Sequence, residues 1–258
     1  MNILSDINFM DFYYNGHYLS EYGGYVGSSD GGLKKYSLLP QRTYYTDKAL
    51  GYDGNIVFGS YLEPRTFNVP IVFDNIDEFG IRAIAGWLNC PDVSKFYFLD
   101  DTLYINCCLD SNASDLDSIS GKDGECELQF IANDPYYYNL NPSSYSFFDI
   151  KKGNLFPMIN AGNVKAFPKI TVVNPSNDKF TINIHDINKN IIESFSVEIP
   201  DSKDAIEIDS KYCTCIAGKR NLFNCVSGEY LSLPTGVFYM SFDVNARHFK
   251  TDFTPRFI

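Results

Sequence analysis

The chain has 258 residues, which is enough for two domains that each bury their own core without help from disulfide bonds. Its formal net charge of −11 excludes a surface built to bind nucleic acid, because such surfaces use lysine and arginine to neutralise phosphates. The aromatic share of 16%, supplied mostly by 19 tyrosines and 21 phenylalanines, favours strands over helices. We therefore expect a globular protein of the all-β class.

The seven cysteines are an odd number and lie in strand-like contexts such as Cys107-Cys108, which predicts free thiols in a reducing cytosol and no structural disulfides. The first residues contain no basic segment followed by an apolar run, and no stretch of about eighteen apolar residues occurs. We expect neither a secretion signal nor contact with a membrane.

The first half predicts several strands in chain order. Asn15-Gly16 between aromatic residues indicates a tight hairpin, since both residues tolerate the left-handed backbone of such a turn. Apolar residues alternate with other residues from Phe67 to Phe73, which is typical of a strand with one buried face. A second hairpin is predicted around Asp100-Asp101, and a further strand at Cys126–Phe130.

One helix is expected, at about residues 76–88. The residues predicted to share its apolar face are Ile76, Phe79, Ala83, Ile84, Trp87 and Leu88. Asn75, followed by Glu78 three positions later, resembles a capping box, and Pro91 closes the far end.

The segment from Asn133 to Ser144 breaks all periodicity and predicts a domain junction. We expect an N-terminal domain at residues 1–145 and a C-terminal domain at 146–258. The second half contains five short apolar runs that predict strands of an antiparallel sandwich: Ile170–Val173, Phe180–Ile184, Phe195–Ile199, Ile206–Ile208 and Val237–Val244.

The motifs of the chain point to no catalytic, cofactor-binding or metal-binding residue. Cys213, Cys215 and Cys225 offer three soft ligands, but a zinc site needs a fourth, and alternating cysteines also suit the buried face of a strand. The run from Asp110 lacks the glycine and glutamate of a calcium loop. No nucleophile or metalloprotease motif occurs. We therefore expect that the chain is not an enzyme and binds no cofactor.

Landmarks in a fixed order make the chain resemble the distal tail (Dit) family of long-tailed phages over nearly its whole length. They are Phe12-x-x-Asn15-Gly16, Gly51-Tyr52-Asp53-Gly54, Arg65-Thr66-Phe67-Asn68-Val69, Leu99-Asp100-Asp101, Asp134-Pro135-Tyr136, Asn160-Ala161-Gly162, Phe167-Pro168-Lys169-Ile170, Leu233-Pro234-x-Gly236 and Pro255-Arg256-Phe257.

The resemblance implies an all-β chain with one helix and two β-sandwich domains, an N-terminal domain like tail-tube proteins and a C-terminal galectin-like domain. It implies a homo-hexameric ring at the tail tip or baseplate of the virion, made in the cytoplasm of the bacterial host. The implied partners are the tail tube protein, the tail-associated lysin or baseplate hub, and the receptor-binding protein. DNA would pass through the ring without being bound.

The charge distribution supports such a conduit by an independent route. Residues 1–150 carry 8 basic against 21 acidic residues, a balance of −13, whereas residues 151–258 carry 13 against 11, a balance of +2. Acidic side chains on a lumen would repel phosphate. The candidate lumen or interface residues are Asp110, Asp115, Asp117, Asp123, Glu125 and Glu127, and an ordinary solvated acidic loop is the alternative reading.

Two other functions stay open at this point. A carbohydrate-binding adhesin module of a tail tip would use exposed aromatic rings, although Trp87 is predicted to lie on the apolar face of the helix. A glycosidase or wall-cleaving lysin would need opposed carboxylates in a cleft, which adjacent acids such as Asp100-Asp101 do not provide.

Overall fold

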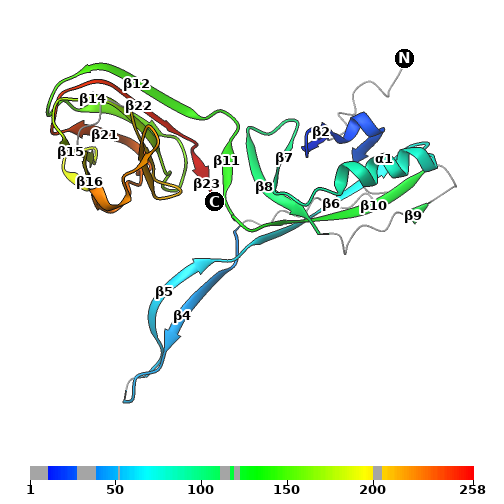
Figure 1. The fold of residues 1–258 in the computed structure, drawn as a ribbon. Coiled ribbons are helices and arrows are strands. Elements are labelled where there is room, and N and C mark those ends of the chain that lie inside the picture. Colours follow the sequence, from blue (N-terminus) through cyan, green and yellow to red (C-terminus); the bar gives the residue numbers. More distant parts are fainter. Residues whose placement is uncertain (1–10, 28–38, 52, 111–116, 119–122, 200–204) are drawn as a thin grey trace. The chain divides into compact units, whose positions relative to one another are not determined.

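The computed structural model describes residues 11–27, 39–51, 53–110, 117–118, 123–199 and 205–258. Contacts divide the chain into two compact units, one running up to Tyr137 and including Ile258, the other comprising Tyr138–Phe257. Strands dominate both units, as the sequence predicts, and the described residues contain one α-helix, which Figure 1 labels α1.

The first unit is built on antiparallel strands in the order β2-β1-β7-β8-β10-β6-β3. Their bounds are β1 Phe12–Tyr14, β2 His17–Tyr18, β3 Gly24–Val26, β6 Arg65–Phe73, β7 Ser94–Phe98, β8 Leu103–Leu109 and β10 Gly124–Ala132. The short strand β9 (Asp117–Ser118) pairs with β10. The hairpins predicted at Asn15-Gly16 and Asp100-Asp101 are both present, and Asn15 and Gly16 adopt the positive φ values of 44° and 86° that the tight turn requires.

Aromatic rings fill the core of this unit. Phe12 of β1 contacts Phe130 of β10, and Phe67 of β6 contacts Phe96 of β7, with ring centroids 6.2 and 5.1 Å apart. These strands are not neighbours in the sheet order. The sheet therefore bends over its own inner face, and the rings pack inside the bend.

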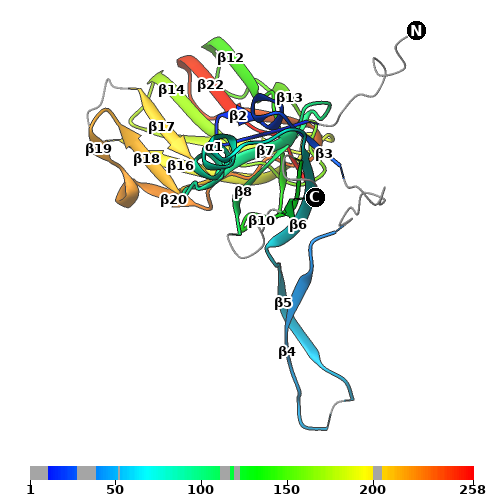
Figure 2. The same cartoon turned by 90° about the vertical axis from the view of Figure 1, so that its right-hand side faces the viewer.

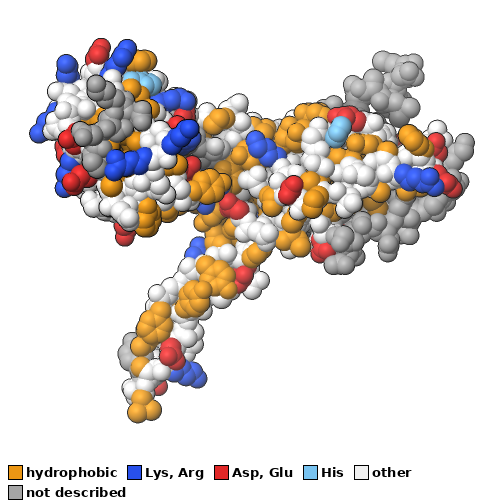
Figure 3. Space-filling view, in the orientation of Figure 1, with side chains coloured by type: hydrophobic (Ala, Val, Ile, Leu, Met, Phe, Trp, Pro, Cys, Tyr) orange, Lys and Arg blue, Asp and Glu red, His pale blue; other side chains and the backbone are white. Residues whose placement is uncertain are grey.

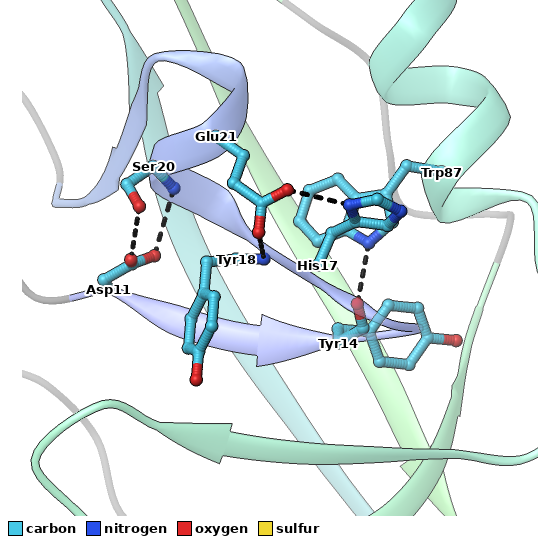
Figure 4. Close-up of polar contacts among 7 residues, drawn as sticks. All are labelled: Asp11, Tyr14, His17, Tyr18, Ser20, Glu21 and Trp87. Carbon is cyan, nitrogen blue, oxygen red and sulfur yellow. Dashed lines mark hydrogen bonds and ion pairs between the residues drawn. The ribbon is translucent and has the colours of Figure 1, made fainter.

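Helix α1 (Glu78–Leu88) closes this core. Its Trp87 stacks on Tyr22 with ring centroids 4.7 Å apart, and the indole Nε1–H donates a hydrogen bond to the Tyr14 carbonyl oxygen at 2.7 Å (Figure 4). In the same view the Glu21 carboxylate accepts from the Tyr18 backbone N–H and contacts the His17 ring at 2.8 Å, which ties the first hairpin to the turn that follows it.

The helix differs from the sequence prediction in two details. It begins at Glu78, and Asp77 is the N-cap whose side chain accepts from the Gly80 N–H, so the predicted cap at Asn75 is wrong. Phe79 and Ala83 are exposed rather than buried. At about 100° per residue they point roughly 140° and 100° away from Ile84, outside the stripe that Ile84, Trp87 and Leu88 bury.

The second unit is a sandwich of two antiparallel sheets. The six-stranded sheet has the order β12-β22-β14-β17-β18-β19 and the five-stranded sheet the order β13-β21-β15-β16-β20. Their bounds are β12 Ser143–Ile150, β13 Phe156–Asn160, β14 Lys169–Pro175, β15 Lys179–His185, β16 Ile191–Glu198, β17 Ile206–Asp209, β18 Thr214–Ala217, β19 Arg220–Asn221, β20 Val226–Gly228, β21 Gly236–Phe242 and β22 Ala246–Phe253.

The core of the second unit lies between these two sheets. Ile170, Ile208 and Phe249 enter it from one sheet, and Phe180 and Phe238 enter it from the other. The five predicted strands of the second half are all present as β14, β15, β16, β17 and β21. The last pieces of the fold are β11 (Tyr137–Asn139) and β23 (Arg256–Phe257), which pair with each other.

Candidate functional site: an apolar arm and an acidic sheet face

A two-stranded ribbon, here called the arm, belongs to the first unit but joins none of its other strands. It consists of β4 (Arg42–Asp47), β5 (Ile56–Leu62) and the turn between them, and each strand pairs only with the other among the described residues. Figures 1 and 2 show it as a separate ribbon. A two-stranded hairpin without a packed face is at best marginally stable in water. The arm is therefore a segment that needs a partner.

The side chains of the arm support that conclusion. Its exposed large apolar residues are Tyr44, Tyr45, Leu50, Ile56, Val57, Phe58 and Tyr61. Leu50 in the turn is fully exposed, and Phe58 is 70% exposed. Figure 3 shows apolar side chains along most of the ribbon's length. A contiguous apolar surface of this kind marks an interaction site rather than a solvated surface.

Apolar side chains occupy both faces of the arm. Tyr45 and Tyr61 lie on one face, where their ring centroids are 5.5 Å apart. Tyr44 follows Tyr45 in alternation and lies on the other face, opposite Ser60. A partner that covers the arm must therefore contact two faces, which a single flat surface cannot do.

The sequence patterns do not predict this arm as a separate feature. The signals are present, since Thr43-Tyr44-Tyr45-Thr46 and Ile56-Val57-Phe58 are rich in aromatic and β-branched residues, and Gly51 and Gly54 lie between them. Both glycines adopt positive φ values, 79° and 92°. Strand propensity predicts that these residues form strands, but it does not predict that the strands lie outside the core.

The acidic residues singled out in the sequence fall into three groups. Asp123, Glu125 and Glu127 alternate with the buried Gly124 and Leu128 along β10, so the three carboxylates project from the outer face of the sheet. The backbone of Asp117, in β9, lies opposite that of Glu125 in the pairing of β9 with β10. Asp110 directly follows β8, and Asp115 lies outside the described residues.

The structure adds Asp74 to the acidic face, at the end of β6. The pKa of Tyr25 is raised first by burial and then by the negative charges of Asp74, Asp123 and Glu125, which places three carboxylates around one phenol. Asp123 also accepts a hydrogen bond from the Asn75 N–H at 3.0 Å. Asp74 is far from the others in sequence, and antiparallel pairing of β6 with β10 brings it beside them.

Comparisons with known proteins give the relatives of this chain. Residues 7–134 match the family model described as the phage tail protein N-terminal domain. The structure is similar to the crystal structure of the Dit protein (gp 19.1) of phage SPP1, described as a paradigm of the hub adsorption apparatus in phages that infect Gram-positive bacteria. The TM-score is 0.74 at 14% identity, covering 96% of this chain and 99% of that one. Residues 7–134 of this chain thus match a phage tail family, and the whole chain has the fold of that Dit protein.

Two further proteins are similar to this chain. The SPbeta prophage-derived uncharacterized protein YomH of Bacillus subtilis (strain 168) is 28% identical over 137 residues, which are 52% of this chain and 52% of YomH. The match thus spans about half the length of that curated relative. A chain of the phage p2 baseplate gives a TM-score of 0.47 at 9% identity, over 94% of this chain and 97% of that one.

The potential metal ligands that the structure describes do not converge. Among the described residues no group of three or more His, Cys, Asp or Glu side chains is placed to hold a metal ion. All seven cysteines are free thiols, and Cys213 is exposed while Cys215 is buried. Burial raises the pKa of the Cys215 thiol to about 11, which keeps it protonated at neutral pH and makes it a poor ligand.

The three histidines of the chain have structural partners. His185 is buried, with its two ring nitrogens 3.1 Å from the Lys189 carbonyl oxygen and 2.8 Å from the Ser241 hydroxyl. His17 pairs with Glu21, and His248 with Ser146. None of the described helices is long and apolar enough to cross a membrane.

Proposed function

We propose that this chain is a non-enzymatic structural protein of the phage tail end and that it assembles with copies of itself into a ring. The ring, a hexamer, would join the tail tube to the baseplate hub or tail-associated lysin and anchor receptor-binding proteins. The observation that carries the proposal is the arm, whose exposed apolar residues need another protein surface. The tail-domain family match and the Dit fold supply the context.

The two units would divide this work. The first unit, which the sequence places at residues 1–145 and the contacts end at Tyr137, would form the ring, because it carries the arm and the acidic face. The second unit, with residues 146–258 as its domain, would be a galectin-like sandwich at the periphery of the ring. Its two sheets enclose a core of their own, which suits a module that docks other proteins without taking part in ring closure.

The acidic face would line the lumen. Asp74, Asp123, Glu125 and Glu127 lie on one outer surface of the first unit, and a ring that turned this surface inward would repel the phosphates of passing DNA. Replacing Glu125 and Glu127 by lysine should make assembled rings retain DNA, with an affinity that falls steeply as salt is raised.

The matched control is the pair Glu198→Lys and Glu207→Lys, because these exposed acids of the second unit give the same change in net charge. A filter-binding titration measures both. Equal DNA retention by the two double variants would contradict a lumen position for the acidic face.

The assembly itself is tested by the mass and projected symmetry of the purified full chain, measured by light scattering and negative-stain electron microscopy, alone and with tail-tube or hub partners. We expect closed rings of six. A protein that stays monomeric under all these conditions contradicts the proposal.

A carbohydrate-binding adhesin module of a tail tip is the second candidate, and one observation favours it. Phe148 of β12 is 70% exposed and stacks on His248 of β22 with ring centroids 4.5 Å apart, which leaves an aromatic surface of the kind that sugars stack on. Trp87 is buried, as predicted, and plays no part. Glycan-array binding that Phe148→Ala abolishes, together with an absence of rings, would favour this function.

A further inference from the structure

The first unit contains an apolar pocket that the proposed function does not use. It has a volume of about 260 Å³ and lies between α1 and the strands beneath it. Ile81, Ile84 and Leu88 line it from the helix, Cys126 and Leu128 line it from β10, and Cys90 lies just after the helix. An apolar pocket at the surface is an unfilled position in the packing of the unit.

The arm carries a side chain of the matching kind. Leu50 lies in the turn between β4 and β5 and is fully exposed, so it makes no packing contact within its own chain. Each arm strand has six or seven residues, and at about 3.3 Å per residue the ribbon is roughly 20 Å long. That length is enough for the tip to reach a neighbouring molecule.

Ring symmetry connects the two features. A closed ring of more than two identical copies uses two different surfaces on each copy, one that meets the preceding copy and one that meets the following copy. The first unit offers such a pair in the arm and the pocket. We propose that Leu50 of one copy inserts into the α1 pocket of the next copy, an inference that rests on the proposed ring.

The sizes agree with this assignment. An apolar cavity of about 150 Å³ is large enough to bind benzene, so a pocket of about 260 Å³ has room for one leucine side chain and some of its neighbours in the turn.

The aromatic rings of the arm supply part of the area that an interface with a second copy needs. Tyr44, Tyr45, Phe58 and Tyr61 are between 43% and 70% exposed. At 150–250 Å² for a buried aromatic side chain, these four offer roughly 340–570 Å². A stable interface buries about 800 Å² on each partner, so the aromatic rings alone fall short. Insertion of Leu50 into a lined pocket adds contact area where the arm ends.

The native thiols in the pocket provide a direct test. In the full-length chain, Leu50→Cys would bring a thiol close to Cys90 or Cys126 of the next copy. Mild oxidation should then give a ladder of covalently linked copies on a non-reducing gel, and mass spectrometry should find the introduced thiol joined to Cys90 or Cys126. The ladder should disappear when Cys90→Ala and Cys126→Ala are added. Ser60→Cys, an exposed position nearer the base of the arm, is the matched control and should give no such link.

A second pair of variants covers the case in which a new thiol disturbs assembly. Leu50→Asp should weaken assembly at least tenfold, whereas Leu50→Met should change it less than threefold. Ala85→Phe, which places a ring in the pocket from an exposed position of α1, should weaken assembly to a similar degree while the circular dichroism spectrum stays unchanged. Assembly is followed by light scattering against protein concentration.

The outcomes separate this inference from the ring itself. Rings that form normally with Leu50→Asp, or Leu50→Cys rings without a link to Cys90 or Cys126, overturn the pocket assignment and leave the ring proposal intact. A wild-type chain that never forms rings overturns both.

Discussion

Two strands of equal length, each containing phenylalanine and isoleucine, differ in how far their side chains are buried. In β15 of the second unit, Phe180, Ile182 and Ile184 are fully buried between two sheets. In β5 of the arm, Ile56, Val57 and Phe58 are exposed. Both segments have the side chains that strands favour. The comparison teaches that a strand pattern predicts local structure, whereas burial depends on whether the chain itself supplies the opposite surface.

The largest expected effect is on the buried side of this comparison. Phe238→Ala removes a fully buried ring from the core of the second unit and should lower the free energy of unfolding by about 3–5 kcal/mol. Phe58→Ala removes a ring of the same type from the arm and should change it by less than about 0.5 kcal/mol. Urea unfolding at a protein concentration below assembly measures both, and similar losses for the two variants would mean that the arm packs within its own chain.

The reverse ranking should hold for assembly. Tyr45→Ser and Phe58→Ser each remove an exposed ring of the arm and should each weaken association by about 2 kcal/mol, or roughly 30-fold, if these rings are centres of the interface. Light scattering over a concentration series provides the measurement. Ile187→Ser, an exposed apolar residue of the second unit, is the control and should leave association unchanged. An equal loss with this control would mean that the arm has no special role.

A smaller effect is expected on the stability of the first unit, which carries the arm. Trp87→Phe keeps a ring beside Tyr22 but removes the donor to the buried Tyr14 carbonyl oxygen, and it should cost about 1–3 kcal/mol of stability. Urea unfolding followed by tyrosine fluorescence measures it. Tyr22→Phe retains the stack and the hydrogen bond and should cost less, so a ranking in the opposite order would contradict the importance assigned to this bond.

The smallest effect concerns the start of α1. Asp77→Ala removes the side chain that accepts from the Gly80 N–H and should cost about 1 kcal/mol. Asp77→Asn keeps an N-cap acceptor and should cost only about 0.3 kcal/mol. Asn75→Gly removes the side chain that the sequence favours as the cap and tolerates the positive φ of 57° at this position, so a larger loss there than for Asp77→Ala in thermal unfolding would contradict the observed cap.

The sequence by itself determined the elements whose signals are local. The Asn15-Gly16 turn, the period-two strands of both halves and the existence of one helix follow from backbone preferences and from alternation of apolar residues, which act over a few neighbouring positions. Periodicity is less exact about faces. It predicts that Phe79 and Ala83 are buried together with Ile84. The contacts of the helix with the bent sheet decide which stripe of side chains is buried.

Only the tertiary structure decided the features that join distant segments. Asp74 belongs to the acidic face because β6 pairs with β10, and the α1 pocket exists because a helix crosses strands that lie on both sides of it in sequence. The arm is the clearest case. Its residues predict strands as well as any in the chain, but their exposure follows from the absence, among the described residues, of a second layer packed on either face of the ribbon, and that is a property of the whole fold.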